Sequence, residues 1–195
     1  MRTLIFSLLC VSASAVAAPA IVLSKGSAPL VSIDDYAVRA PQAGAWQLKA
    51  SRQMVVYARK MDGPDDSMLA IMEDVRLPGP QSTEPALLDF VRARLAQRGG
   101  AGTARYAQVA TTVSMDAQLP HCVRWEQSAH DLRVNDGTTQ PYMQLQSAGR
   151  FCLSEHNPAS AIDVFYSVRH VPPDMPAGLE AEGEAFLASL QRKTP

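Results

Sequence analysis

The sequence has no marked excess of charge and no long apolar run. Its 18 Lys and Arg residues nearly balance its 19 Asp and Glu residues, and the formal net charge is −1. This balance argues against nucleic acid or an anionic membrane as a partner, because both attract strongly basic surfaces. The apolar stretch at the amino terminus is shorter than the ~20 residues that a helix needs to span a bilayer. We therefore expect no nucleic-acid partner and no membrane span.

Motifs of common active sites are also missing. The chain has no G-x-S-x-G nucleophile turn, no dinucleotide-binding glycine fingerprint and no C-x-x-C pair. Three carboxylates in one loop, Asp62, Asp65 and Asp66, lack the spacing and the closing glutamate of a calcium-binding EF-hand. We interpret that loop as a solvated turn. The sequence therefore predicts no cofactor and assigns no catalytic or metal-binding residue.

The first 17 residues have the pattern of a cleaved signal peptide. Arg2 precedes an apolar segment over residues 4–11, and small residues continue to Ala17, which suits cleavage after that position. Two alternatives stay open: an uncleaved anchor, for which the segment is short, and lipid attachment at Cys10, which the bulky Leu9 disfavours. We expect a periplasmic or secreted protein.

Loss of the signal peptide leaves two of the three cysteines, Cys122 and Cys152. An even number of cysteines in an exported chain favours a disulfide. Such a bond stabilises by roughly 3–4 kcal/mol on the chain-entropy model, and by less where the hairpin forms without it. The alternative is two unpaired thiols or a redox pair, and the lack of a C-x-x-C motif argues against the latter.

The segment from His121 to Glu155 reads as one long β-hairpin. Cys122 and Cys152 lie equally far from Gly137 in the polar loop, so a fold at that loop places the two thiols opposite each other. In this register, apolar side chains gather at odd positions of both strands and polar ones at even positions. Side chains alternate between the faces of a strand, so this separation by polarity supports the register.

Two further pairs test the same register. Trp125 comes to lie over Gly149, an arrangement in which an aromatic ring covers a bare glycine. Arg124 faces Arg150, which is unfavourable unless Glu126, diagonal to Arg150, screens the two charges.

Helix signals occur twice outside the hairpin. The first helix is expected from Glu84 to about Arg98, with Thr83 as N-cap and Gly99 at its end. Its leucines and Val91 form one apolar stripe, and its arginines are interpreted as a solvated face. A second amphipathic helix is expected after the prolines at positions 172–176.

Strand patterns fill much of the remaining chain, at residues 33–41, 46–60, 68–77, 105–116 and 162–170. The order of elements predicts an α+β fold, in which two helices cover a mostly antiparallel sheet. We divide the chain into a signal peptide at 1–17, an extended leader or added edge strand at 18–32, and a single domain at 33–192.

Several short segments resemble the PsbP-like sandwich domains and their exported bacterial relatives. The likeness spans about residues 33–192, and the resemblance implies a PsbP-like sandwich, a protein- or ligand-binding role, and no known catalytic residue. The segments that carry it are residues 36–41 followed by Trp46, residues 149–152 with His156 and Pro158, residues 166–169, and residues 186–190.

Polar clusters offer little chemistry in this arrangement. His130 and His156 stand roughly 40 Å apart along the hairpin at ~3.3 Å per residue, and His121 points to the opposite face, so a zinc site is not expected. Tyr166 is expected on the core face of its strand, with Ser167 and Arg169 on the wetter one.

Two classes of function follow. The first is a non-catalytic periplasmic or secreted module that binds a protein or a small ligand; its expected partner is another exported or envelope protein, an immunity role against a secreted toxin being one example. The second is an enzyme with a dispersed active site that one sequence does not reveal. Titratable groups converging in a pocket would favour the enzyme, and an apolar groove would favour the binding module.

Overall fold

The computed structural model describes residues 21–23, 29–42, 46–61, 66–81, 83–99, 105–132, 142–173 and 175–193. The expected signal peptide with Cys10, the hairpin loop around Gly137, and two carboxylates of the acidic loop, Asp62 and Asp65, lie outside these residues. Asp66 is described, and its side chain accepts a hydrogen bond from the backbone N–H of Val171 at 3.2 Å. None of the described helices has the length and apolar character that crossing a membrane requires.

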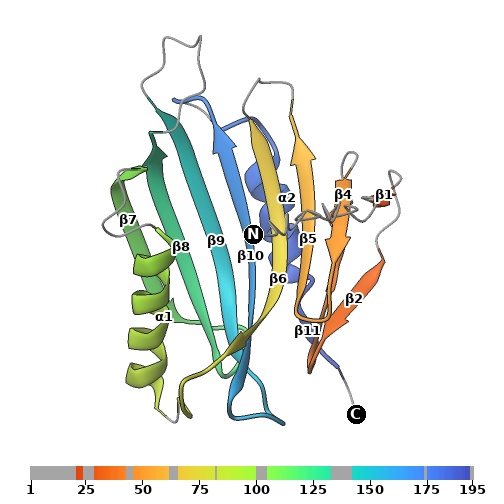
Figure 1. The fold of residues 1–195 in the computed structure, drawn as a ribbon, viewed down its shortest axis with the longest axis vertical. Coiled ribbons are helices and arrows are strands. Elements are labelled where there is room, and N and C mark those ends of the chain that lie inside the picture. The colour runs from red at the N-terminus through yellow and green to blue at the C-terminus, as the bar shows by residue number, and fades with distance from the viewer. Residues whose placement is uncertain are drawn as a thin grey trace, which may run out of the picture.

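The described strands form two antiparallel sheets (Figure 1). The larger sheet has eight strands, and β1 at one of its edges falls within the segment that was expected to be a leader or an added edge strand. The order in this sheet is β1 (Ile21–Leu23), β4 (Trp46–Ala50), β5 (Met54–Lys60), β6 (Ser67–Arg76), β10 (Ser160–His170), β9 (Met143–Leu153), β8 (Cys122–Asp131) and β7 (Tyr106–Met115). The smaller sheet has the order β11 (Gln191–Arg192), β3 (Tyr36–Arg39) and β2 (Leu30–Ile33).

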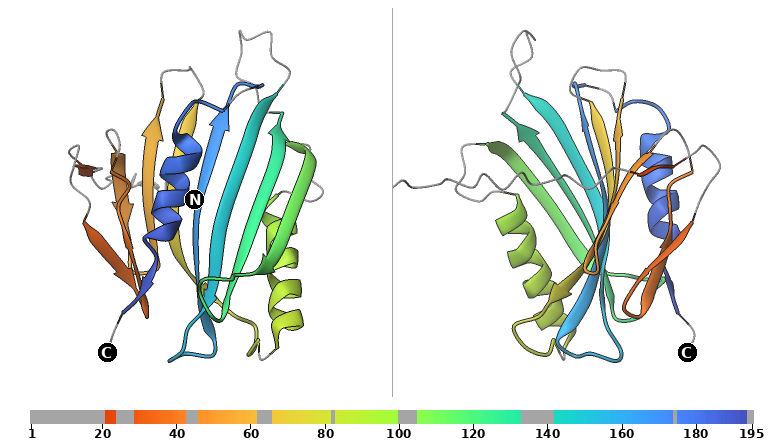
Figure 2. Two further views of the ribbon diagram at one scale, coloured as in Figure 1. Left: turned by 180° about the vertical axis from the view of Figure 1, so that it is seen from behind. Right: turned by 45° about the vertical axis from the view of Figure 1, so that its right-hand side comes forward.

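Two helices lie on opposite faces of the large sheet (Figure 2). Helix α1 (Glu84–Arg98) begins and ends as the sequence predicts: the Thr83 hydroxyl caps its first turn by accepting from Ala86 N–H at 3.4 Å, and Gly99 closes it. Helix α2 (Leu179–Ala188) and the small sheet cover the other face. The prediction of an α+β fold with a mostly antiparallel sheet and two helices is confirmed.

The hairpin register is also confirmed. Cys122 pairs with Cys152, and Trp125 pairs with Gly149. A disulfide joins the two cysteines, whose Cα atoms are 4.1 Å apart. A Cβ atom at Gly149 would lie 2.5 Å from the Trp125 ring, so the ring occupies space that only a glycine leaves open.

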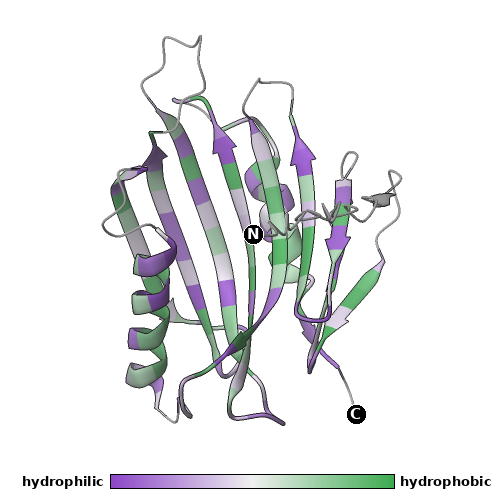
Figure 3. Cartoon of the chain, viewed as in Figure 1, coloured by the Kyte–Doolittle hydropathy of each residue, from purple (hydrophilic) through white to green (hydrophobic). Residues whose placement is uncertain are grey.

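Each face of the sheet contributes to a core of its own. Along the strands, hydrophilic and hydrophobic residues alternate in bands (Figure 3). Odd positions of the hairpin, such as Val123 and Phe151, pack under α1, whereas Cys122 and Cys152 pack under α2 together with Ile162 of β10. The hairpin's even face is therefore partly core as well as polar, because Cys122 and Cys152 belong to the core that contains Phe186 and Leu187 of α2.

The opposed arginines are neutralised by carboxylates that the hairpin alone does not contain. Arg150 Nε lies 2.8 Å from Asp116 Oδ2 in the turn after β7, and Arg124 Nη2 lies 2.6 Å from Glu184 Oε1 on α2. Glu126 also lies 3.6 Å from Arg124 and so screens one of the two charges, but Asp116 and Glu184 make the closer contacts.

Candidate functional site

Two hollows lie on opposite faces of β8, β9 and β10. We call them the arginine pocket, on the α1 face, and the glutamate groove, on the α2 face. Their volumes are similar, about 290 Å³ and about 310 Å³. Both take side chains from the same three strands, because successive residues of a strand point to opposite faces.

The arginine pocket exists because α1 stops short of the end of the sheet. The helix ends at Arg98, and the N–H of Gly99 bonds to Leu95 O at 2.8 Å. Beyond this point the α1 face of the strands is not covered by the helix. The pocket has an apolar part surrounded by three arginines and three serines; these lining residues are Leu69, Leu145, Phe165, Arg98, Arg105, Arg169, Ser67, Ser147 and Ser167.

Buried carboxylates hold these arginines in place. Arg105 donates two hydrogen bonds to the fully buried Asp131, at 3.1 and 2.8 Å, and Arg169 Nε lies 3.4 Å from the same carboxylate. Arg98 bonds to Asp163, which is 1% exposed, at 2.8 Å, and to Glu73 at 2.6 Å. Two-pronged pairing of this kind fixes the plane of a guanidinium as well as its position.

The charge of the pocket is positive. Its charged lining side chains are three arginines and one aspartate, a formal +2. The hydrogen bond to Asp131 raises the pKa of Arg105, so that arginine keeps its charge at all ordinary pH values. Arg98 also stacks over the Phe165 ring, 4.1 Å from its centroid, which places a flat cation against the apolar floor.

Hydroxyl groups also line the arginine pocket. Ser147 of β9 and Ser167 of β10 are direct neighbours across the two strands, and their Oγ atoms lie 2.9 Å apart. Gln127 of β8 also lines the pocket and bonds to Thr111 Oγ1 at 3.1 Å and to Leu95 O at 3.2 Å. The pocket thus combines cations and neutral hydrogen-bonding groups with an apolar surface.

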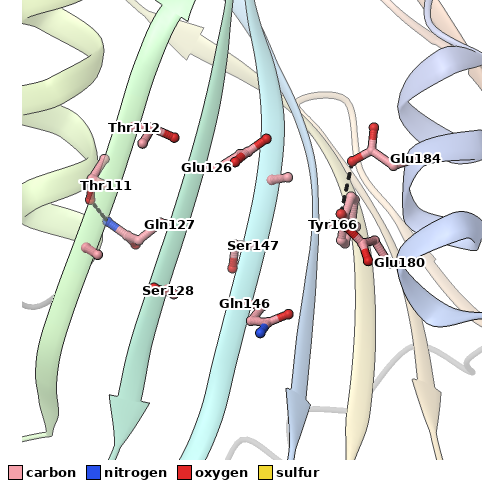
Figure 4. Close-up of a pocket in the computed structure, with 12 residues that line it drawn as sticks. Thr111, Thr112, Glu126, Gln127, Ser128, Gln146, Ser147, Tyr166, Glu180 and Glu184 are labelled. Atoms are coloured by element: carbon pink, nitrogen blue, oxygen red, sulfur yellow. Dashed lines mark hydrogen bonds between the residues drawn. The ribbon is translucent and has the colours of Figure 1, made fainter. Parts of the chain in front are cut away.

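The glutamate groove has the opposite charge (Figure 4). Glu126 reaches into it from β8, and Glu180 and Glu184 reach in from α2; no basic residue is among the described residues that line it. Tyr166 Oη donates to Glu184 Oε1 at 3.0 Å, and Arg124 supports the same oxygen from outside the groove. Burial, followed by the charge of Glu184, raises the pKa of Tyr166, so its hydroxyl stays protonated and acts as a donor.

The structure separates the polar residues of β10 as predicted. Tyr166 is buried and lies on the α2 face, whereas Ser167 and Arg169 line the arginine pocket on the other face. His130 stacks on Tyr142, with ring centroids 3.7 Å apart. Within the described ranges, no three His, Cys, Asp or Glu side chains are placed to hold a metal ion.

The interpretation of the α1 arginines as a solvated face was wrong for two of them. Arg94 and Arg98 point toward the sheet and pair with Glu73 at 2.6 Å, and only Arg92 is mostly exposed. Helical spacing contained the signal, because positions 94 and 98 follow Val91 at intervals of three and seven residues and so share its face.

Asp131 was missed for a different reason. The predicted hairpin from His121 to Glu155 assigned no role to Asp131, and β8 extends to this residue. The alternation of small and polar residues after Gln127 fits a strand, yet nothing in it marks Asp131 as the buried partner of Arg105.

Comparison with protein-family models, curated proteins and solved structures finds no match to this chain. What the protein does is therefore inferred from the two hollows and from the surfaces around them.

Proposed function

We propose that the protein is an exported, non-catalytic binding module whose ligand site is the arginine pocket. The observation that carries this proposal is the set of three guanidinium groups, Arg98, Arg105 and Arg169, around an apolar floor. Guanidinium groups match carboxylates and phosphates in shape and charge. The expected ligand is a small molecule with an anionic head and an apolar part.

The groups in the pocket favour binding over chemistry. Among its described lining residues there is no His, Cys, Lys or Glu. The one carboxylate, Asp131, accepts two hydrogen bonds from Arg105 and lies 3.4 Å from Arg169 Nε, so its oxygens hold these two arginines in place. A pocket of fixed charges orients a ligand without exchanging protons with it.

The amino-terminal pattern and the disulfide support export. The Cys122–Cys152 bond lies in the core under α2, and bonds of this kind persist in oxidising compartments. We also propose that the fold is a PsbP-like sandwich. The two-helix arrangement supports this, and so does the position of two of the resembling segments, residues 149–152 and 166–169, on the neighbouring strands β9 and β10.

Titration calorimetry with octyl phosphate, octanoate and octylamine tests the ligand site. The two anions are expected to bind, and octylamine is not. Arg105→Gln should weaken octyl phosphate binding about tenfold to a hundredfold, since a hydrogen bond to a charged group contributes ~1.5–3 kcal/mol. Arg92→Gln is the matched control, because Arg92 pairs only with the neighbouring exposed Asp89 on the outer side of α1. Equal binding of octylamine and the anions, or turnover of any probe, would refute the proposal.

A further inference from the structure

The large sheet has one long open edge. β7 is the last strand in the order and pairs only with β8. A bulge interrupts the pairing between Ala107 and Ala110, and from there to Met115 the two strands pair without interruption. Both ribbon views place β7 at the margin of the sheet (Figures 1 and 2). Its outer side faces no other strand in the described part of the chain.

Backbone groups on this outer side can be assigned from the ladder. The N–H of Asp116 bonds to Cys122 O at 2.9 Å, so the N–H of Asp116 points toward β8. Hydrogen-bonded and non-bonded pairs alternate along antiparallel strands. The N–H and C=O groups of Thr111, Val113 and Met115 therefore point away from β8, and the described residues supply no backbone partner for them.

Apart from the bulge between Ala107 and Ala110, β7 lacks the features that normally protect a sheet edge. Edge strands usually carry charged residues or proline that prevent pairing with another chain, or they are very short. β7 has ten residues with neither a charge nor a proline, and residues 108–112 are all exposed. At the opposite edge, β1 is three residues long. β7 is therefore the edge that favours an added strand.

Charge near this edge indicates what that strand should carry. On the α2 face, Thr112 is paired with Glu126, whose side chain is 61% exposed, and the glutamate groove lies beyond it. Arg124, beside Ser114 on the same face, is neutralised by Glu184 at 2.6 Å, so Glu126, Glu180, Glu184 and Arg124 together carry a formal charge of −2. An added strand lies ~4.8 Å outside β7 and ~10 Å from β8, so a long basic side chain on that face can meet Glu126. On the α1 face the neighbours are the small or apolar Thr111 and Val113, which suit apolar side chains.

We propose that β7 is a docking edge for an extended segment of a partner protein. Every second residue of that segment is Lys or Arg, and the residues between are small or apolar. Backbone pairing to Thr111, Val113 and Met115 supplies affinity, and the glutamate groove supplies selectivity. A second copy of this chain fits less well, because its own β7 has no basic residue to place beside Glu126.

The probe is a labelled nine-residue peptide in which lysine alternates with threonine and valine. The control is the same peptide with glutamate in place of each lysine. Fluorescence anisotropy should show binding of the lysine peptide only. Hydrogen exchange should show new protection at the amides of Thr111, Val113 and Met115. Protection at another strand instead, or equal binding of the glutamate peptide, would overturn the proposal.

Two matched variants separate pairing from side-chain effects. Thr111→Pro removes an outward N–H and puts the proline ring where the added strand would lie, while the bonds to β8 remain. Affinity for the lysine peptide should fall at least about tenfold. Thr111→Ala also loses the hydrogen bond between the Thr111 hydroxyl and Gln127, but it keeps the backbone N–H. This variant should bind the lysine peptide as the unchanged protein does. Equal affinity of these two variants would contradict docking at this edge.

Charge reversal and self-association complete the test. Glu126→Lys should weaken the lysine peptide and permit the glutamate peptide. If the three outward amides are already protected in the protein alone, and more so at higher concentration, the occupant is a second copy and the proposal of a basic partner segment is wrong. Octyl phosphate binding in the Glu126→Lys variant reports on the arginine pocket separately, because Glu126 lies on the other face of the sheet, so failure of either proposal leaves the other testable.

Discussion

The arginine pocket and the glutamate groove are built on the same three strands but hold their charges differently. In the pocket, guanidinium groups are anchored by carboxylates that are almost fully buried, such as Asp131 and Asp163. In the groove, the carboxylates themselves face solvent, and Glu184 is 45% exposed. A buried anchor fixes the geometry of a site, whereas exposed charges tune attraction over a distance and respond to salt. This contrast suits a preformed ligand pocket on one face and a selective but adaptable surface on the other.

The contrast predicts a large difference in stability between matched acid-to-amide variants. Asp163→Asn should destabilise the protein by about 3–5 kcal/mol, because it removes the buried one of the two carboxylates that Arg94 and Arg98 share and leaves Glu73 as their remaining counter-charge. Glu184→Gln in the groove should cost no more than about 1 kcal/mol, since its pair with Arg124 is partly exposed. Urea unfolding of the two variants measures both effects, and similar losses would contradict the distinction between anchored and exposed charge.

Opening the disulfide should weaken both hollows together. The bond closes a segment with a sequence separation of 30 and joins two of the three strands that they share. Replacing Cys122 and Cys152 by alanine should lower the free energy of unfolding by roughly 3–4 kcal/mol, and by less if the hairpin is stable alone. Thiol labelling of the unreduced protein is the control, and two reactive sulfhydryls there would remove the basis for this prediction.

Two glycines allow each face to be disturbed separately. A Cβ at Gly149 would lie 2.5 Å from Trp125 on the α1 face, and one at Gly183 would lie 2.5 Å from Tyr166 on the α2 face. Each change to alanine should cost about 1–3 kcal/mol through overpacking. Gly149→Ala should weaken octyl phosphate binding more, and Gly183→Ala should affect the lysine peptide more. Gly79→Ala, which meets nothing within 4 Å, is the control for both.

The smallest effect concerns a carboxylate outside both hollows. Burial tends to raise the pKa of Asp35, but hydrogen bonds from the Ser154 hydroxyl and the N–H groups of Glu155 and His156 lower it below 3.8 overall. Stability from these bonds is present above the unfolded pKa and is lost as pH falls through the lower folded pKa. Asp35→Asn should therefore flatten the loss of stability below about pH 4 and leave both binding activities unchanged. Acid titration followed by circular dichroism measures this.

Local periodicity was enough to predict the two helices, the long strands of the large sheet and the hairpin register, but not the small sheet of β2, β3 and β11. Alternation within β8 and β9 places Trp125 over Gly149 without any knowledge of the rest of the chain. Helix α1 likewise carries its own start and stop signals in Thr83 and Gly99.

Local periodicity could not predict the arginine pocket or the glutamate groove, because both depend on segments that are far apart in the sequence. Whether a sheet face is covered depends on where a helix stops above it, and this is set by contacts such as Arg98 with Asp163, which are 65 residues apart. The open edge at β7 likewise depends on the strand order of the whole sheet. A single sequence reports the face of each residue and not the neighbour that covers it.

The central position of β10 has a consequence for how the molecule is assembled. Residues 160–170 join two groups of strands, β1–β4–β5–β6 and β9–β8–β7, that are otherwise separate within the large sheet. While the chain emerges from its amino end, both groups are present before the strand that unites them. A protein that binds the growing chain before β10 is synthesised would meet two groups of strands whose inner edges have no neighbouring strand. A chain truncated before residue 160 would keep both edges unpaired.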